Sequence, residues 1–172
     1  MSAWRPDVLG EPFEARTLHL ADDDEGPVVA TLVRYAPPTE EPLRAARVVL
    51  YVHGWSDYFF QRGLAEYWHA RGAAFYALDL RKYGRSLRDG QTPGYVQDLR
   101  TYDEDLDAAL AVIRSAHGAA ARLLVMGHST GGLVSVLWAS RRPGDVAAMV
   151  LNSPWLELQG SSILRHVSGP AI

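Results

Sequence analysis

The sequence predicts a single α/β domain in which a mostly parallel sheet lies between two layers of helices. Two observations predict this arrangement. After residue 46, short apolar runs typical of strands buried on both faces alternate with longer segments of helical period. Glycine-rich and polar segments follow these apolar runs, as expected where ligands bind at the carboxyl ends of parallel strands. This alternation specifies a three-layer αβα sandwich, and we assign residues 1–172 to it as one domain.

The expected elements begin with a hairpin and continue as alternating strands and helices. Two strands, 17–20 and 28–35, flank the acidic turn 22–26. Further strands are expected at 47–52, 73–80, 122–126 and 146–151, and helices at 60–71, 96–117 and 131–141.

Composition excludes several classes of function. A net charge of −3 without a basic cluster argues against nucleic-acid binding. Because the chain has no cysteine, it has no disulfide framework, thiol nucleophile or thiolate metal site. No apolar run is long enough to span a bilayer. The N-terminus lacks the apolar core of a signal peptide, so we expect a cytoplasmic protein.

One motif carries the chemistry. Residues 127–131 read Gly-His-Ser-Thr-Gly, preceded by an expected strand and followed by an expected helix. This G-x-S-x-G pattern in a strand–turn–helix setting is typical of a nucleophile elbow. The sharp turn holds Ser129 in a strained conformation, and Gly127 and Gly131 let the strand and helix pass closely on either side. Ser129 is therefore the predicted nucleophile.

A second motif follows the strand at 47–52. Gly54 permits a tight turn there and allows a backbone N–H to point into the site. The predicted oxyanion hole uses the N–H groups of Trp55 and of Thr130, the residue after the nucleophile. The side chain of His53 is expected to be structural rather than a general base.

These motifs together resemble the α/β-hydrolase superfamily. The pattern consists of His53-Gly54, the D-x-R-x-x-G-x-S loop at 79–86 and the elbow with Gly132 behind it. It is most similar to the monoacylglycerol lipase and lysophospholipase-like group, also classed as serine aminopeptidase S33-like. The resemblance covers residues 14–170, and it implies a serine esterase acting on a small-molecule acyl ester without a cofactor.

The resemblance covers only the first half of that fold, which continues through a lid and two further strands carrying the acid and histidine of the triad. We therefore expect a sheet truncated before its last strands, with residues 152–172 starting the lid. In the order that the fold requires, the chain offers Glu157 and His166 after the nucleophile. Glu157 follows a strand at the correct edge, but no strand positions His166, so we expect both to be lid or surface residues. Asp145 precedes its strand and belongs to the opposite edge.

Two hypotheses of different class follow. The first is a serine hydrolase that forms an acyl-enzyme on Ser129. The alternative is a truncated, catalytically inactive remnant or fragment that acts as a binding or interaction protein. The strand at 146–151 would form an exposed apolar edge, which predicts self-association through it.

Overall fold

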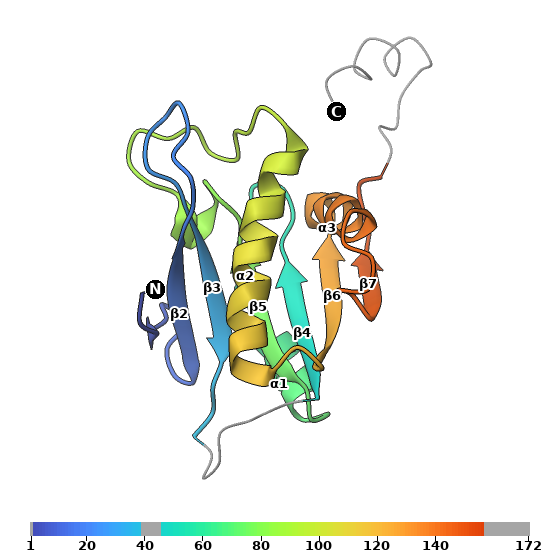
Figure 1. The fold of residues 1–172 in the computed structure, drawn as a ribbon. Helices are drawn as coiled ribbons and strands as arrows, with labels where there is room; N and C mark the ends of the chain where they lie inside the picture. The colour runs from blue at the N-terminus through green and yellow to red at the C-terminus, as the bar shows by residue number, and fades with distance from the viewer. Residues whose placement is uncertain (1, 39–45, 157–172) are drawn as a thin grey trace.

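The computed structural model describes residues 2–38 and 46–156, which form one seven-stranded sheet in the order β1-β2-β3-β5-β4-β6-β7 (Figure 1). Neighbours from β1 to β5 pair antiparallel, whereas β5, β4, β6 and β7 pair parallel. The strands are β1 (Arg5–Pro6), β2 (Phe13–His19), β3 (Val29–Tyr35), β4 (Arg47–Val52), β5 (Ala74–Asp79), β6 (Arg122–His128) and β7 (Ala148–Asn152).

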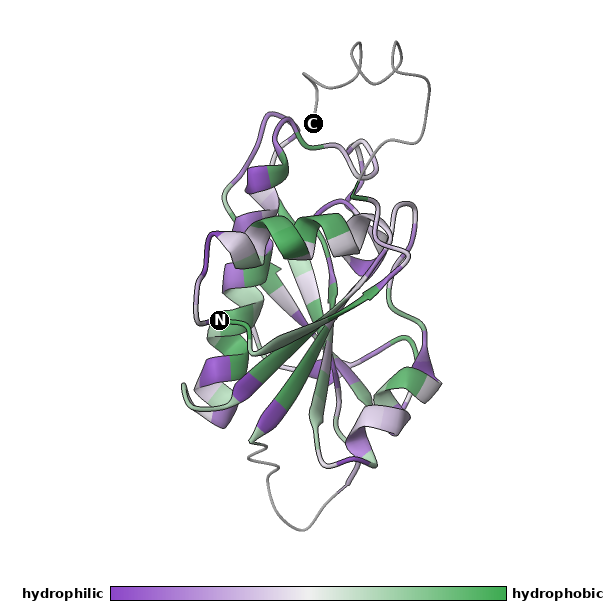
Figure 2. Cartoon of the chain, turned by 90° about the vertical axis from the view of Figure 1, so that its right-hand side faces the viewer, coloured by the Kyte–Doolittle hydropathy of each residue, from purple (hydrophilic) through white to green (hydrophobic). Residues whose placement is uncertain are grey.

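Helices cover both faces of this sheet. Figure 2 shows α2 (Tyr102–His117) and α3 (Thr130–Ser140) on one side and α1 (Arg62–His69) on the other. Two short 3₁₀ helices, η1 (Gly84–Ser86) and η2 (Leu99–Thr101), lie in the connection between β5 and α2. The predicted three-layer αβα arrangement is confirmed.

The sheet has one hydrophobic core on each face, because successive side chains of a buried strand point to opposite faces. In β4, Val48 and Leu50 point into the cluster formed with α2 and α3. Val49 and Tyr51 point the other way and pack with Ala65 of α1. A strand that is apolar on both faces is thereby buried on both, and each large side chain so buried contributes about 1.5–3 kcal/mol.

Two boundaries differ by four residues or more from those expected, and the others differ by no more than two. The first strand of the hairpin starts at Phe13 rather than at residue 17, because residues 13–16 also pair with β3 although their sequence is mostly polar. The long helix starts at Tyr102 rather than at residue 96. Asp98 accepts a hydrogen bond from the Arg100 N–H and caps the 3₁₀ turn that precedes the helix.

The strand expected at 146–151 is β7, and it lies at the edge of the described sheet. Val150 is 38% exposed and Leu151 is 36% exposed. The described residues therefore leave apolar side chains of this strand uncovered.

The parallel strands bring their carboxyl ends to one edge of the sheet (Figure 1). The segments that follow Val52, Asp79, His128 and Asn152 consequently lie near one another. The predicted site residues that the structure describes belong to these segments, except Gly127, which lies within β6 next to the turn.

Candidate active site

Ser129 occupies the turn between β6 and α3, at the carboxyl edge of the sheet. Its backbone is left-handed, with φ 49° and ψ −118°. The turn is held from both sides: the Ser129 N–H donates to the Asn152 carbonyl at 3.0 Å, and the Ser129 carbonyl accepts from the Trp155 N–H at 3.0 Å. The end of β7 therefore supports the backbone of the predicted nucleophile directly.

Glycines make this turn possible. A Cβ on Gly127 would lie 2.6 Å from the Cα of Gly132, so strand and helix pass in van der Waals contact. A Cβ on Gly131 would overlap the carbonyl oxygens of Val52 and His53 at the end of β4. The helix start thus packs against two strands at once, and side chains at these positions would push it away.

The segment after β4 packs on the elbow. A Cβ on Gly54 would lie 3.2 Å from the Cβ of Ser129. Thr130 begins α3, so its N–H is among the first-turn amides that have no acceptor within the helix. Among the described residues, none accepts a hydrogen bond from the Trp55 N–H. Both predicted oxyanion donors therefore belong to segments that meet at Ser129.

Backbone strain is concentrated at this edge of the sheet. Within the described parts of the chain, four residues other than glycine have positive φ, and each follows one of the four parallel strands. They are Ser56 (φ 52°), Lys82 (φ 59°), Ser129 (φ 49°) and Ser153 (φ 46°). Such conformations persist where the surroundings enforce them, and they cluster at functional sites.

The two imidazoles nearest the elbow are engaged elsewhere. His128 Nδ1 lies 3.2 Å from Asn152 Nδ2. His53 is 1% exposed, and burial lowers its pKa, so its imidazole is neutral. Of the residues that the structure describes, no imidazole is hydrogen-bonded to the Ser129 hydroxyl. Glu157 and His166 lie outside the described residues.

A shallow groove of about 230 Å³ adjoins the Trp55 segment. Its walls come from the segments that follow β4 and β5, and they are mainly apolar and aromatic. The Trp55 indole is 61% exposed and packs edge-on against Tyr83, with ring centroids 5.9 Å apart. The other lining residues are Ser56, Asp57, Tyr58, Lys82, Gly84, Leu87 and Pro93.

Sequence reasoning gave no role to the charged residues of the loop after β5. Arg85 pairs with the buried Asp79 and with Asp7, and Arg81 pairs with the buried Asp105. The available signal was the presence of three cations within six residues after a buried strand, because buried cations need acidic partners. Apart from Asp79, their acidic partners come from segments far away in the sequence, which the pattern alone does not identify.

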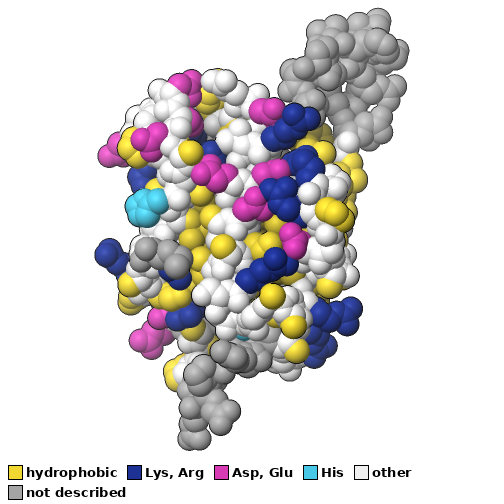
Figure 3. All heavy atoms as spheres, viewed as in Figure 1, with side chains coloured by type: hydrophobic (Ala, Val, Ile, Leu, Met, Phe, Trp, Pro, Cys, Tyr) yellow, Lys and Arg dark blue, Asp and Glu magenta, His cyan; other side chains and the backbone are white. Residues whose placement is uncertain are grey.

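The surface charges are interspersed. Figure 3 shows acidic and basic side chains side by side over α2 and α3. Several are ion-paired, as Arg114 and Asp145 are at 2.6 Å. Searched over residues 2–38 and 46–156, the structure contains no group of three or more acidic or imidazole side chains able to hold a metal ion. None of the helices in that part of the chain combines the length and apolar character needed to cross a membrane.

Comparison with a family model and with known sequences gives matches that agree with one another. The family model described as serine aminopeptidase, S33, matches residues 44–169. A monoacylglycerol lipase of Mycolicibacterium smegmatis is 33% identical over 108 residues, which cover 62% of this chain and 37% of that protein. Phospholipase YtpA of Bacillus subtilis is 29% identical over 118 residues, covering 67% of this chain and 43% of that protein. The chain thus spans less than half the length of these curated relatives.

Solved structures show the same fold. A thermostable carboxyl esterase from Bacillus coagulans superposes with a TM-score of 0.65 at 16% identity, covering 80% of this chain and 43% of that one. An acetyl xylan esterase from Paenibacillus sp. R4 superposes with a TM-score of 0.64 at 21% identity, covering 99% of this chain and 58% of that one.

Proposed function

Because the chain belongs to the serine aminopeptidase S33 family of α/β-hydrolases, we propose that it supplies the nucleophile of an esterase or lipase, with Ser129 attacking a carboxylic ester. The observation that carries this proposal is the strained turn of Ser129 between β6 and α3, with Gly54 packed against it. Family membership makes the chain part of an α/β-hydrolase, whereas the esterase or lipase activity and the acyl-enzyme route are our proposal.

The proposed reaction has two halves. Ser129 Oγ attacks the ester carbonyl carbon, its proton passes to a general base, and the N–H groups of Trp55 and Thr130 stabilise the oxyanion. The carbon–oxygen bond to the alcohol then breaks, and the alcohol leaves with that proton. Water attacks the acyl-enzyme, and the carboxylic acid is released as Ser129 regains its proton. Removing one oxyanion donor typically costs about 3 kcal/mol of transition-state stabilisation.

This scheme also requires a general base and the acidic residue of the triad. The resemblance places them on two strands after a lid that starts at residue 152, so residues 1–172 would be the first half of the catalytic domain. Glu157 and His166 are the alternative pair within the chain. The order nucleophile, acid, histidine is the same in both cases.

We propose a monoacylglycerol or a lysophospholipid as substrate. The curated relatives are named as a monoacylglycerol lipase and a phospholipase. The groove beside Trp55 has the apolar and aromatic lining that an acyl chain or its glycerol ester would need.

Release of fatty acid tests the substrate class. The full-length protein that contains residues 1–172 is purified and incubated with a monoacylglycerol, a lysophospholipid, p-nitrophenyl butyrate and an amino-acid p-nitroanilide. We expect hydrolysis of the esters, and loss of at least a thousandfold in Ser129→Ala. Ser153→Ala is the matched control, because Ser153 also has positive φ but lies after β7, outside the turn between β6 and α3. Ester hydrolysis that survives in Ser129→Ala, or preference for the anilide, would contradict the proposal.

A second candidate is an inactive relative that binds an acyl ester without cleaving it. It is favoured by the absence of an imidazole on the Ser129 hydroxyl among the described residues. Calorimetric titration with a monoacylglycerol distinguishes the two: binding without release of fatty acid supports this candidate and excludes the hydrolase.

A further inference from the structure

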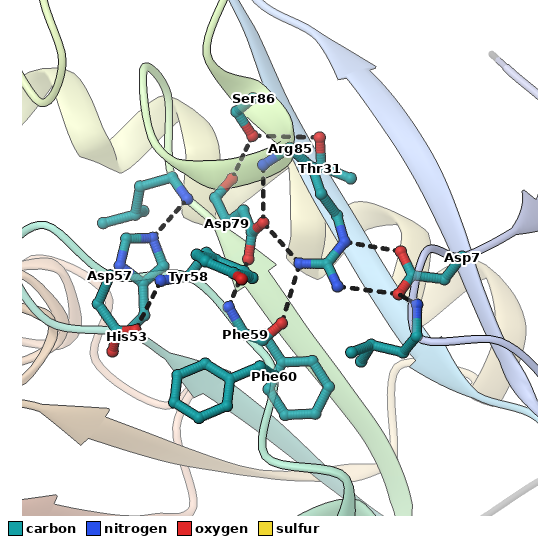
Figure 4. Close-up of polar contacts among 12 residues, drawn as sticks. Asp7, Thr31, His53, Asp57, Tyr58, Phe59, Phe60, Asp79, Arg85 and Ser86 are labelled. Carbon is teal, nitrogen blue, oxygen red and sulfur yellow. Dashed lines mark hydrogen bonds and ion pairs between the residues drawn. The ribbon is translucent and has the colours of Figure 1, made fainter.

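The segment between β4 and α1, residues 53–60, carries Trp55 and is held by a set of buried polar contacts (Figure 4). At its first residue, His53 Nε2 accepts a hydrogen bond from the Leu80 N–H at 3.1 Å. A neutral imidazole has one donor and one acceptor nitrogen, so His53 Nδ1 must carry the proton. It donates this proton to the Gly54 carbonyl, 2.7 Å away.

This hydrogen bond also sets the direction of the next amide. The Gly54 carbonyl and the Trp55 N–H belong to one peptide group, whose bond is trans. In a trans peptide the C=O and N–H point in opposite directions. With the Gly54 oxygen turned toward the His53 ring, the Trp55 N–H points away from that ring.

The far end of the segment is held at Phe59. Its N–H donates to Asp79 Oδ1 at 2.9 Å, and its carbonyl accepts from Arg85 Nη1 at 3.0 Å. Arg85 also bonds Asp79 Oδ2 at 2.8 Å and both carboxylate oxygens of Asp7. The side chains of Asp79 and Asp7 are 0% and 1% exposed, so the guanidinium links two buried carboxylates to one backbone carbonyl.

Both ends of the segment are therefore fixed by the residues that follow β5. We propose that His53, Asp79 and Arg85 are positioning residues that hold the Gly54–Trp55 peptide with its N–H directed at the space beside Ser129. This inference rests on the proposed function, because the amide has a catalytic use only if Ser129 attacks an ester. Its structural part, the orientation of the amide, can be measured separately.

The orientation is measured by nuclear magnetic resonance on the whole chain. The ¹⁵N shifts of the His53 ring should show the neutral form with the proton on Nδ1. The residual dipolar coupling of the Trp55 N–H should match a rigid amide pointing away from that ring. In His53→Leu and in Arg85→Lys we expect this coupling to fall by half or more. His53→Asn keeps a donor near the Nδ1 position and should retain most of it.

The matched control is Asp105→Asn, which weakens the buried pair with Arg81 in the same loop but touches neither end of the 53–60 segment. It should lower the melting temperature while leaving the Trp55 coupling unchanged. A proton on His53 Nε2, or an equal loss of the coupling in Asp105→Asn, would overturn the proposal. The latter would show that the coupling reports only general stability.

Kinetics provide the functional arm. In the positioning variants we expect kcat for the ester to fall about 10- to 100-fold with KM within twofold, because the lost orientation affects the transition state. A change confined to KM would contradict a positioning role. If Ser129→Ala leaves hydrolysis intact, the proposed function fails, while the resonance measurements still decide the orientation of the amide.

Discussion

The two sides of the candidate site are held very differently. On the β5 side, Arg81, Lys82 and Arg85 each meet two carboxylates, and all three cations are nearly or fully buried. On the β7 side, Val150 and Leu151 are exposed, and the segment after the strand contacts the elbow through backbone hydrogen bonds.

This difference shows which part of the site is held in place by contacts within the described residues. Buried ion pairs contribute little net stability, but they define geometry because removing one partner is costly. The Trp55 segment is therefore fixed by the chain's own contacts. The elbow is fixed toward β4 and α3, whereas its outer support is an edge strand with uncovered apolar side chains.

Removing a buried cation should have the largest effect on stability. Arg85→Ala leaves the buried carboxylates of Asp7 and Asp79 without their partner, so we expect the free energy of unfolding to fall by about 3–5 kcal/mol. Arg114→Ala breaks an ion pair that is partly exposed, and it should cost less than about 1 kcal/mol. Urea unfolding measures both, and equal losses would contradict the claim that the buried ion pairs of the β5 side hold this part of the site.

Substitution of a glycine at the elbow should have the next largest effect on stability. In Gly131→Ala the new methyl group would overlap backbone oxygens at the end of β4, which cannot move without shifting the strand. We expect a loss of about 1–3 kcal/mol. Gly63→Ala is the control, since nothing lies within 4 Å of its Cβ position in α1, and it should be neutral or stabilising by up to about 1 kcal/mol.

The β5 side should also show a pH dependence. Burial lowers the pKa of His53, opposed by Asp79 and Asp57 and reinforced by Arg85. The folded state therefore binds a proton less readily than the unfolded state. The stability that the neutral ring contributes is present above about pH 6.5, the ordinary pKa, and is lost as the pH falls below it.

We expect this loss to reach up to about 1.4 kcal/mol per pH unit. His53→Asn, which does not titrate, should reduce it. Urea midpoints at pH 7.5 and 5.5 give the comparison, and an unchanged pH dependence in the variant would be inconsistent with a buried neutral His53.

The smallest effect on stability is expected at the β7 edge. Val150→Lys replaces a side chain that is 38% exposed, so the free energy of unfolding should change by no more than about 0.5 kcal/mol. A lysine on an edge strand discourages pairing with a second chain. Light scattering after size exclusion should show association of the parent chain and a monomeric variant. A monomeric parent chain would refute self-association through this edge.

Much of the fold could be predicted from the sequence because buried parallel strands are continuous apolar runs. The segments 47–52 and 122–126 needed no tertiary information, and both lie within observed strands. The two-residue strand β1 could not be predicted, since its exposed Arg5 and Pro6 have no strand pattern and pair only because β2 lies beside them.

The candidate site likewise has features that the sequence predicts and features that it does not. The position of Ser129 at a strand-to-helix turn follows from a local motif with glycines at fixed offsets. The contacts of Asp79 and Arg85 do not, because their partners Asp7 and Phe59 lie 20 to 78 residues away in sequence. Only the folded arrangement pairs them.

Peptide mapping after reaction with a fluorophosphonate tests most directly whether Ser129 is the nucleophile. The reagent phosphonylates an activated serine in one step and needs no later hydrolysis. We predict a single adduct on the peptide that contains Ser129, absent in Ser129→Ala and retained in Ser153→Ala. The full-length protein is used, and an adduct on another serine, or a folded protein that remains unlabelled at Ser129, would contradict this role.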